Sequence, residues 1–149
     1  MKKGFLIFTL FIVGIYTHYA QLNVEYIRDT LPLKTHNEVQ AMRIDRTIPF
    51  EFVKNSNLWK AYDSTITKSI EHAVWFRFKL QNTTSSSIEI YLKSKSHYTH
   101  IFIEDVGATK HLKNGFLVSL NERDNKNESH FTKLSIQSGR TYTCYVKMA

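Results

Sequence analysis

Apolar residues alternate with polar or aromatic ones most clearly along residues 73–82. The apolar positions, each two residues apart, are Val74, Phe76, Phe78 and Leu80. Because successive side chains of an extended chain point to opposite faces, these four share one face. Trp75, Arg77 and Lys79 share the other. The pattern predicts a strand with one face in the core and the other facing solvent or a polar ligand.

A second alternating segment follows after a short polar run. Residues 83–87 read Thr-Thr-Ser-Ser-Ser, which is typical of a turn, and residues 88–93 alternate again. Two alternating segments joined by a turn predict an antiparallel hairpin. In that hairpin Glu89, Tyr91 and Lys93 would lie beside the polar face of the first strand.

Shorter alternating segments continue along the chain. Strands are predicted at residues 47–53, 99–105, 131–136 and 141–148, with one or two short strands around the turn dipeptide at 114–115. Polar runs such as residues 121–129 separate them. Many short strands with polar turns and little helical periodicity predict an all-β fold, an antiparallel β-sandwich.

Two segments have no sustained strand pattern. In residues 21–46 we expect a short strand at 24–27 and a short helical turn at 36–42. In residues 54–72 apolar residues recur every four positions, but the Asp, Ser and Thr residues among them disfavour a helix. We therefore expect a structured loop with a short helix there, over one end of the sandwich, where it could act as a lid.

The strand motifs carry a resemblance to a known family. Four segments resemble the type 2 extracellular sensor domain of bacterial seven-transmembrane receptors with diverse intracellular signalling modules. They are Trp75-Phe-Arg-Phe-Lys-Leu-Gln-Asn82, the strand at 88–93, Thr99-His-Ile-Phe-Ile-Glu104 and residues 134–147. The resemblance extends from Ile48 to the end of the sequence. It implies a jelly-roll-like sandwich outside the cytoplasmic membrane that senses a carbohydrate or another small polar molecule.

In that family a transmembrane bundle follows the sensor domain, whereas the last predicted strand of this sequence ends at its C-terminus. One alternative is therefore a sandwich that is incomplete at the C-terminus. The chain would then be the N-terminal part of a receptor or a truncated relative. A full-length receptor would be held in the membrane by the missing C-terminal region.

The first 20 residues have the layout of a secretory signal peptide. Lys2 and Lys3 precede an apolar run at residues 5–16, and the segment ends at Ala20. The apolar run is shorter than the roughly 20 residues that span a bilayer, which favours a cleaved signal over an uncleaved anchor. The predicted organisation is a signal peptide at 1–20, a lead-in at 21–46 and a sensor-type domain at 47–149. The expected location is the periplasm or the extracytoplasmic face of a bacterial inner membrane.

The charge and the cysteine content limit which partners and which covalent links the protein can have. The formal net charge is +7, and without Lys2 and Lys3 there remain 18 basic and 13 acidic residues, or +5. The cations are scattered, which argues against a nucleic-acid partner and suits anionic lipid head groups or acidic glycans. Cys144 is the only cysteine, which excludes an internal disulfide. Its position in an apolar strand face predicts a buried small hydrophobic residue.

The outward face of the predicted hairpin is the candidate ligand site. Its residues are Trp75, Arg77, Lys79, Tyr91 and Glu89. An aromatic ring stacks on a sugar and charged groups bind its hydroxyls, so this combination suits a carbohydrate or another small polar ligand. The structural alternative is that this face packs against another part of the protein, with Arg77 paired to Glu89 across the strands.

Metal binding and catalysis have less support. His97, His100 and His111 lack a further ligand at fixed spacing, and His97 and His100 would diverge from an extended chain. No metal or other cofactor is predicted. The sequence has no glycine-rich phosphate loop or nucleophile elbow, and Cys144 has no predictable base beside it, so we expect no enzyme activity.

The leading hypothesis is a non-catalytic, extracytoplasmic sensory input domain that binds a small polar ligand or a glycan. The alternative is a secreted structural or adhesion module that binds another protein. The sequence predicts neither the identity of the ligand nor the oligomeric state.

Overall fold

The structure is a computed structural model that describes residues 22–25, 33–63, 65–66, 68–94 and 96–149, with side chains described from Val39 onward. The predicted signal peptide, residues 1–20, lies outside the described residues.

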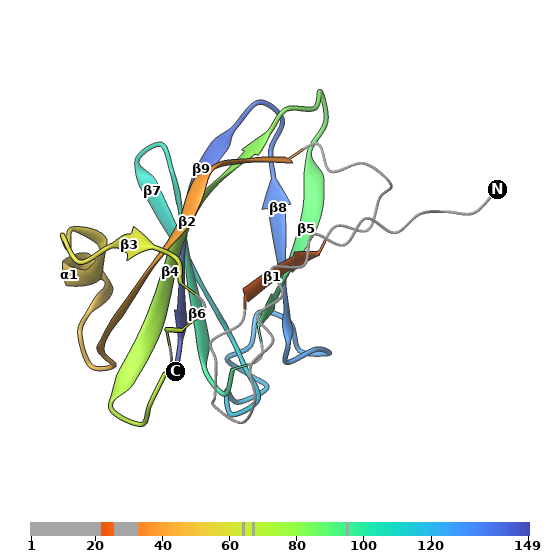
Figure 1. Ribbon diagram of the computed structural model, residues 1–149. Coiled ribbons are helices and arrows are strands. Elements are labelled where there is room, and N and C mark those ends of the chain that lie inside the picture. The colour runs from red at the N-terminus through yellow and green to blue at the C-terminus, as the bar shows by residue number, and fades with distance from the viewer. Residues whose placement is uncertain (1–21, 26–32, 64, 67, 95) are drawn as a thin grey trace.

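The described residues form nine strands and one short helix, and the strands build two facing antiparallel sheets (Figure 1). The larger sheet has the order β3-β2-β4-β9-β6-β7. Its strands are β2 (Leu33–Asp45), β3 (Lys60–Ala61), β4 (His72–Asn82), β6 (Thr99–Asp105), β7 (Ala108–Asn114) and β9 (Thr141–Met148). The smaller sheet has the order β1-β5-β8, with β1 (Leu22–Glu25), β5 (Ile88–Ser94) and β8 (Phe131–Ile136). Helix α1 spans Phe50–Lys54. The prediction of an all-β antiparallel sandwich is confirmed.

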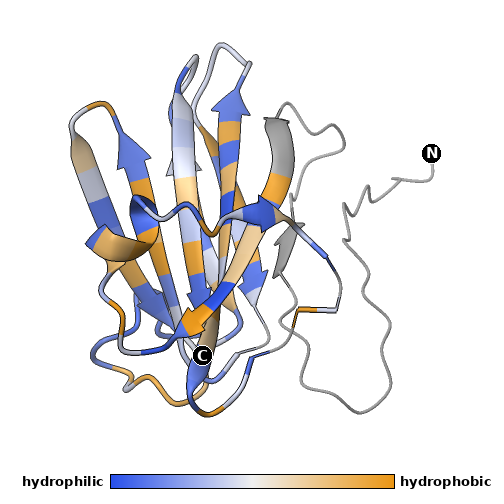
Figure 2. Ribbon diagram, turned by 60° about the vertical axis from the view of Figure 1, so that its left-hand side comes forward, coloured by the Kyte–Doolittle hydropathy of each residue, from blue (hydrophilic) through white to orange (hydrophobic). Residues whose placement is uncertain are grey.

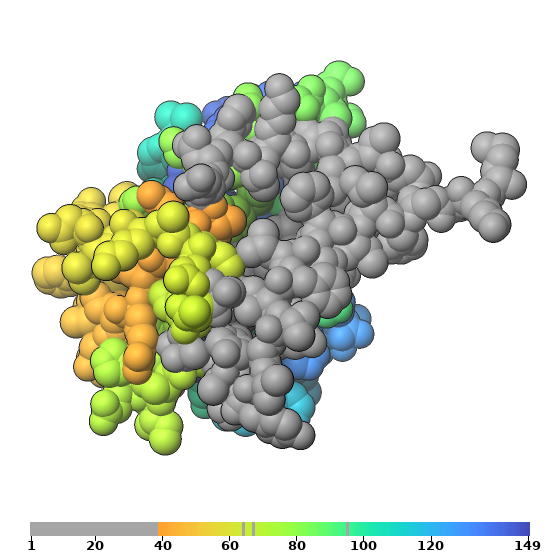
Figure 3. Space-filling model, viewed as in Figure 1, coloured from red at the N-terminus to blue at the C-terminus, as the bar shows by residue number. Residues whose placement is uncertain are grey.

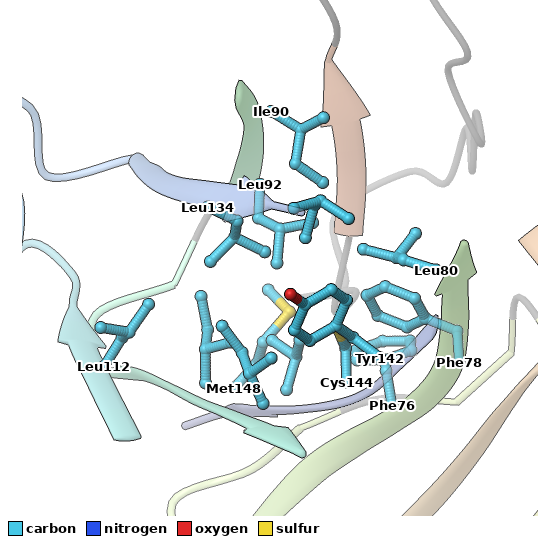
Figure 4. Close-up of a cluster of buried hydrophobic side chains, with 14 of the residues drawn as sticks. Phe76, Phe78, Leu80, Ile90, Leu92, Leu112, Leu134, Tyr142, Cys144 and Met148 are labelled. Carbon is cyan, nitrogen blue, oxygen red and sulfur yellow. The ribbon is translucent and has the colours of Figure 1, made fainter. Parts of the chain in front are cut away.

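The main hydrophobic core lies between the sheets (Figure 4). Figure 2 shows the cause, because apolar and polar bands alternate along the strands. The larger sheet contributes Ala41, Val74, Phe76, Phe78, Leu80, Ile101, Ile103, Leu112, Tyr142, Cys144, Val146 and Met148, and the smaller sheet Ile88, Ile90, Leu92, Leu134 and Ile136. The predicted inward face of residues 73–82 and the burial of Cys144 are therefore confirmed.

The predicted hairpin between residues 73–82 and 88–93 is wrong. β4 pairs with β2 and β9 in the larger sheet, whereas β5 pairs with β1 and β8 in the smaller one. Both long edges of β4 are occupied, so no edge remains for β5. The polar run between them carries the chain from one sheet to the other.

Asn82 holds this crossover in place. Its side chain is fully buried, and its Nδ2 donates to the carbonyl oxygens of Ser86, at 2.8 Å, and of Ile136 in β8, at 3.0 Å. Its Oδ1 accepts a hydrogen bond from the backbone N–H of Thr84, at 2.9 Å. One amide thus connects the end of β4 to the opposite sheet and fixes the turn.

The helical turn that we predicted at residues 36–42 is also wrong, because these residues belong to β2. β2 pairs with β4 along its length, but the register shifts between His36 and Gln40. A β-bulge of this kind breaks the two-residue alternation on which strand recognition depends.

The strand predicted at 47–53 is instead a turn followed by α1. Asp45 Oδ1 accepts the backbone N–H of Thr47 at 2.8 Å, and Pro49 directly precedes the helix. Phe50 and Val53 face the sheet, whereas Phe52, which the alternating pattern would also place inward, is 73% exposed. The apolar spacing of three residues thus belongs to a helix.

The segment at 54–72 contains the short strand β3. Among its described residues only Lys54, the last residue of α1, is helical, so the short helix predicted within this segment is not observed there. β3 pairs with β2, and the Tyr62 backbone N–H donates to the Val39 carbonyl at 2.8 Å. The first part of the segment is therefore fixed along the edge of the larger sheet.

A second, smaller core covers the outer face of the larger sheet. The residues from Val39 through α1 and β3 form one continuous flank of the molecule (Figure 3). Its buried members are Met42, Val53, Trp59, Ala73, Trp75 and Tyr145, with Phe50 and Phe102 packed against them. Part of the outer face of this sheet is thus interior.

A row of stacked rings continues from this second core to the sheet edge. The ring centroid of Phe102 lies 4.0 Å from that of Phe50 and 4.2 Å from that of His111. His100 Nδ1 lies 3.0 Å from His111 Nε2, and the two rings are stacked. Burial lowers the pKa of His100 to about 4, and the charges of His111 and Lys147 act in the same direction. Burial also lowers the pKa of His111. Both imidazoles are therefore neutral at neutral pH.

Replacing Asn82 with alanine should remove the side-chain partners of the buried Ile136 carbonyl and of the Thr84 N–H, and should break the link between the two sheets. We expect Asn82→Ala to lower the free energy of unfolding by about 3 kcal/mol, measured by chemical denaturation. Asn127→Ala, an exposed position, is the control and should change it by less than about 0.5 kcal/mol. Equal effects of the two substitutions would contradict the role of Asn82 as the link between the sheets.

The His100 environment predicts a pH dependence of stability. In the unfolded chain the imidazole titrates near its ordinary pKa of 6.5, whereas in the folded protein it titrates near 4, so the unfolded state binds more protons in between. This contribution to stability is complete above pH 6.5 and is lost as the pH falls toward 4. Because His100 is partly exposed to solvent, we expect a loss of about 1 to 2 kcal/mol.

Chemical denaturation at a series of pH values tests this prediction. His100→Gln should flatten the profile in that range, whereas His130→Gln, at an exposed position, should leave its slope unchanged. A His100→Gln profile parallel to that of the wild type would contradict the prediction.

Candidate functional site

A groove lies at the end of the sandwich where β4 begins and β9 ends. Its volume is about 760 Å³. It is lined by Arg46, Lys68, Ser69, Ile70, Glu71, His97, Tyr98, Leu117 and Ala149. Five separate segments meet here: the chain after β2, the loop before β4, the connector between β5 and β6, the loop after β7, and the residue after β9. The groove combines an apolar lining with a few charged and polar groups, which is the usual composition of a small-molecule site.

Backbone contacts fix Arg46 at one wall of the groove. Its N–H donates to the Glu71 carbonyl at 2.9 Å, and its guanidinium donates to the Ile70 carbonyl at 2.9 Å. Lys147 Nζ donates to the Arg46 carbonyl at 2.6 Å. Arg46 therefore joins the end of β2, the loop before β4 and the last strand.

Lys68 belongs to a hydrogen-bonded chain that crosses the floor of the groove. Its ammonium donates to Ser96 Oγ at 3.1 Å, and the buried Ser96 hydroxyl donates to the Ala149 carbonyl at 2.8 Å. Ala149 and Tyr98 exchange two backbone hydrogen bonds of 3.0 and 3.1 Å. The position of the Lys68 ammonium is thus coupled to the backbone just after β9.

Asn114 and Gly115 place the loop that carries Leu117. The Asn114 side chain is buried and donates to the carbonyl oxygen of Phe131 at 2.7 Å. A Cβ atom at Gly115 would lie 2.3 Å from the His97 carbonyl oxygen, and the φ angle there is 128°, so only glycine allows this approach. The Leu117 N–H then donates to the His97 carbonyl at 3.0 Å. The dipeptide that we predicted as a turn therefore anchors one wall of the groove.

The groove has more positive than negative charge. Within the described part of the chain, neither Arg46 nor Lys68 has a carboxylate within ion-pair distance. Burial lowers the pKa of Lys68, and burial followed by the nearby Arg46 charge lowers the pKa of Lys147. Among the described lining residues Arg46 and Lys68 are cationic and Glu71 is the carboxylate, so a bound anion would be favourable.

The residues predicted to bind a ligand are not at this groove. Trp75 is 1% exposed, and it lies beneath Phe50, whose ring centroid is 6.0 Å away. Arg77 donates through Nε to Gln40 Oε1 at 2.9 Å and lies over the Trp59 ring, with its Cζ 4.6 Å from the centroid. The structural alternative, in which this face packs against another part of the protein, therefore describes Trp75 and Arg77.

The other three predicted residues are accessible but do not form one surface. Lys79 is exposed on the outer face of the larger sheet. Glu89 and Tyr91 lie on the outer face of the smaller sheet, where Glu89 pairs with Lys133 at 2.6 Å. The predicted pair of Arg77 with Glu89 is therefore wrong, because the two residues belong to different sheets. A ligand-binding role for the five residues stays a prediction.

Sequence reasoning missed the groove because its residues come from segments without periodicity. The only available signals were the loop at 54–72, which we expected to lie over one end of the sandwich, and the dipeptide at 114–115. That loop does contribute Lys68, Ser69, Ile70 and Glu71 to the groove. Nothing in the sequence pattern brought Arg46 to the same place.

The histidines do not assemble into a recognisable metal site. His97 lines the groove, whereas His100 and His111 lie together on the outer sheet face. Among the described residues no group of three or more potential metal ligands is found. Burial also raises the pKa of the Cys144 thiol to about 12, so this residue stays protonated and is a poor nucleophile.

No helix within the described ranges has the length and apolar character that crossing a membrane requires. Among curated proteins and among solved structures, no match to this chain was found. The sequence model of the family described as 7TMR-DISM extracellular 2 matches residues 21–149, which includes every described strand. The chain therefore belongs to the 7TMR-DISM extracellular 2 family, an extracellular domain of seven-transmembrane receptors with an extracytoplasmic sensory role.

Proposed function

We propose that this domain is a non-catalytic sensory module whose groove binds a small polar ligand that carries an acidic group. The observation that carries the proposal is that two cations, Arg46 and Lys68, meet at one groove and form no ion pair with a carboxylate among the described residues. A carboxylate or phosphate on the ligand would accept charge-assisted hydrogen bonds from both. Family membership supports a sensory role but does not indicate the ligand.

The other lining residues suit a small molecule with an apolar part. Ile70, Tyr98 and Leu117 provide apolar contact area, while Ser69 and His97 provide hydrogen-bonding groups. The volume of about 760 Å³ lies within the range of known ligand pockets. Glu71 is the one carboxylate among the described lining residues, and it would disfavour a ligand with several negative charges.

The same contacts offer a route from ligand to the end of β9. A ligand that accepts a hydrogen bond from Lys68 competes with Ser96 for the ammonium, and the Ser96 hydroxyl in turn holds the Ala149 carbonyl. Binding would therefore change the hydrogen bonding of the backbone at Ala149 without any change in the main core. We propose this as the first step by which the domain reports its ligand.

Isothermal titration of the purified protein tests the ligand site. The panel should contain small organic acids, sugar acids and phosphate esters, together with uncharged sugars. We expect binding of at least one acidic compound, and Lys68→Met, which keeps the length of the side chain, should weaken it by about tenfold or more. Lys110→Met, an exposed residue on β7, is the control and should bind as the wild type does.

Two outcomes would contradict the proposal. One is that only uncharged sugars bind. The other is that affinity survives in Lys68→Met and is lost in Lys79→Met, which would instead support the outer sheet face predicted from the sequence.

A further inference from the structure

We infer that the groove end of the domain rests on the surface of a phospholipid membrane, with the loop at residues 116–120 inserted among the lipid head groups. This goes beyond ligand binding, because it concerns a different partner and a loop of which only Leu117 also lines the groove. It is carried by exposed apolar residues that gather at one end of the sandwich.

Large apolar side chains at the groove end are exposed to solvent and do not contribute to the buried cores of the domain. Among the described residues, seven large hydrophobic side chains are exposed, and four of them belong to the groove end: Ile70, Phe116, Leu117 and Leu120. Their exposed fractions are 86, 62, 54 and 59%. Figure 2 shows apolar stretches in the loops at the end where the C label lies. Clusters of this kind mark interaction surfaces rather than ordinary solvated surface.

The loop is held in a form that keeps these side chains outward. Arg123 donates to the carbonyl oxygens of Val118, at 2.7 Å, and of Phe116, at 2.9 Å. Val118 is buried and fastens the middle of the loop to the body of the protein. The loop therefore cannot bury its flanking apolar residues by local collapse without breaking these contacts.

Cations lie at the same end as the apolar loop. Lys68 and Arg46 line the groove with Leu117, and Arg123 donates to the backbone of the loop. Acidic residues belong to the same segments: Asp45, Glu71, Glu122 and Asp124. Apolar tips that enter the interface, with basic groups at the level of the phosphates, are the arrangement by which peripheral proteins bind bilayers. Because acids are also present, we expect the apolar contacts to provide most of the affinity.

The position of the groove end within a receptor favours a lipid surface as its binding partner. The domain belongs to membrane receptors, so a bilayer lies within its reach. Ala149 is at the same end, paired with Tyr98 beside the groove. In a receptor whose membrane region follows β9, this end would be the part of the domain nearest to the bilayer. The groove would then open beside the head-group layer.

Co-sedimentation of the purified protein with large unilamellar vesicles tests the inference. The vesicles are phosphatidylcholine alone, or phosphatidylcholine with about one quarter phosphatidylglycerol. We expect binding to both, stronger on the anionic vesicles and weakened there by salt. The combined substitution Phe116→Ser, Leu117→Ser and Leu120→Ser should lower the partition coefficient by about tenfold or more.

Val106→Ser is the matched control. Val106 is 88% exposed in the turn between β6 and β7, at the opposite end of β6 from the groove, so its replacement should leave vesicle binding unchanged. All variants carry the same N-terminal segment, so a difference between them reports on the loop. Circular dichroism should show the same fold in each, because only exposed side chains are changed.

The outcomes separate this inference from the proposed ligand site. Absence of vesicle binding by the wild-type protein, or equal binding by the triple variant, would overturn it. Lys68→Met should bind phosphatidylcholine vesicles as the wild type does even where it no longer binds an acidic ligand, so either proposal can fail alone.

Discussion

β4 and β9, the central pair of the larger sheet, carry large aromatic side chains on the outer face in addition to a fully apolar inner face, and the rest of the structure follows from the need to cover both. The inner face is covered by the smaller sheet through the main core. The outer face, with Trp75 and Tyr145, is covered by Phe50 of α1 and by Trp59. Burying large aromatic side chains is among the strongest stabilising contributions in a domain of this size. The chain between β2 and β4 therefore has a packing role.

Much of the architecture could be predicted because it depends on local alternation. The bounds of β6, β8 and β9 match the predicted strands, and the apolar face of β9 around Cys144 lies in the core as predicted. The partner of β4 could not be predicted, since a polar run such as residues 83–87 serves equally well as a hairpin turn or as a crossover between sheets. The decision depends on the buried Asn82 side chain and its contact with β8, which is remote in sequence.

The candidate site was misplaced for a related reason. Alternation shows which side chains of β4 share a face, but it does not show whether another segment covers that face. Phe50 and Val53 cover Trp75, and their own pattern was ambiguous because a spacing of two and a spacing of three both occur in residues 48–53. Trp75 therefore became interior, and its Nε1 has no hydrogen-bond partner among the described atoms. The accessible polar side chains that could bind a ligand lie instead at the end of the sheet, which α1 and its flanking residues do not cover.

The position of the groove limits how a bound ligand can act. β9 is buried between β4 and β6, and its inward residues Cys144, Val146 and Met148 are completely enclosed, so the strand has little freedom to shift within the sheet. Past Met148 the restraints become polar: the Ser96 hydroxyl, the backbone of Tyr98 and, through Ser96, the Lys68 ammonium. Hydrogen bonds at an open groove can be exchanged for bonds to a ligand at little net cost, whereas core packing cannot. A change caused by the ligand would therefore be confined to the end of β9 and to the loops that line the groove.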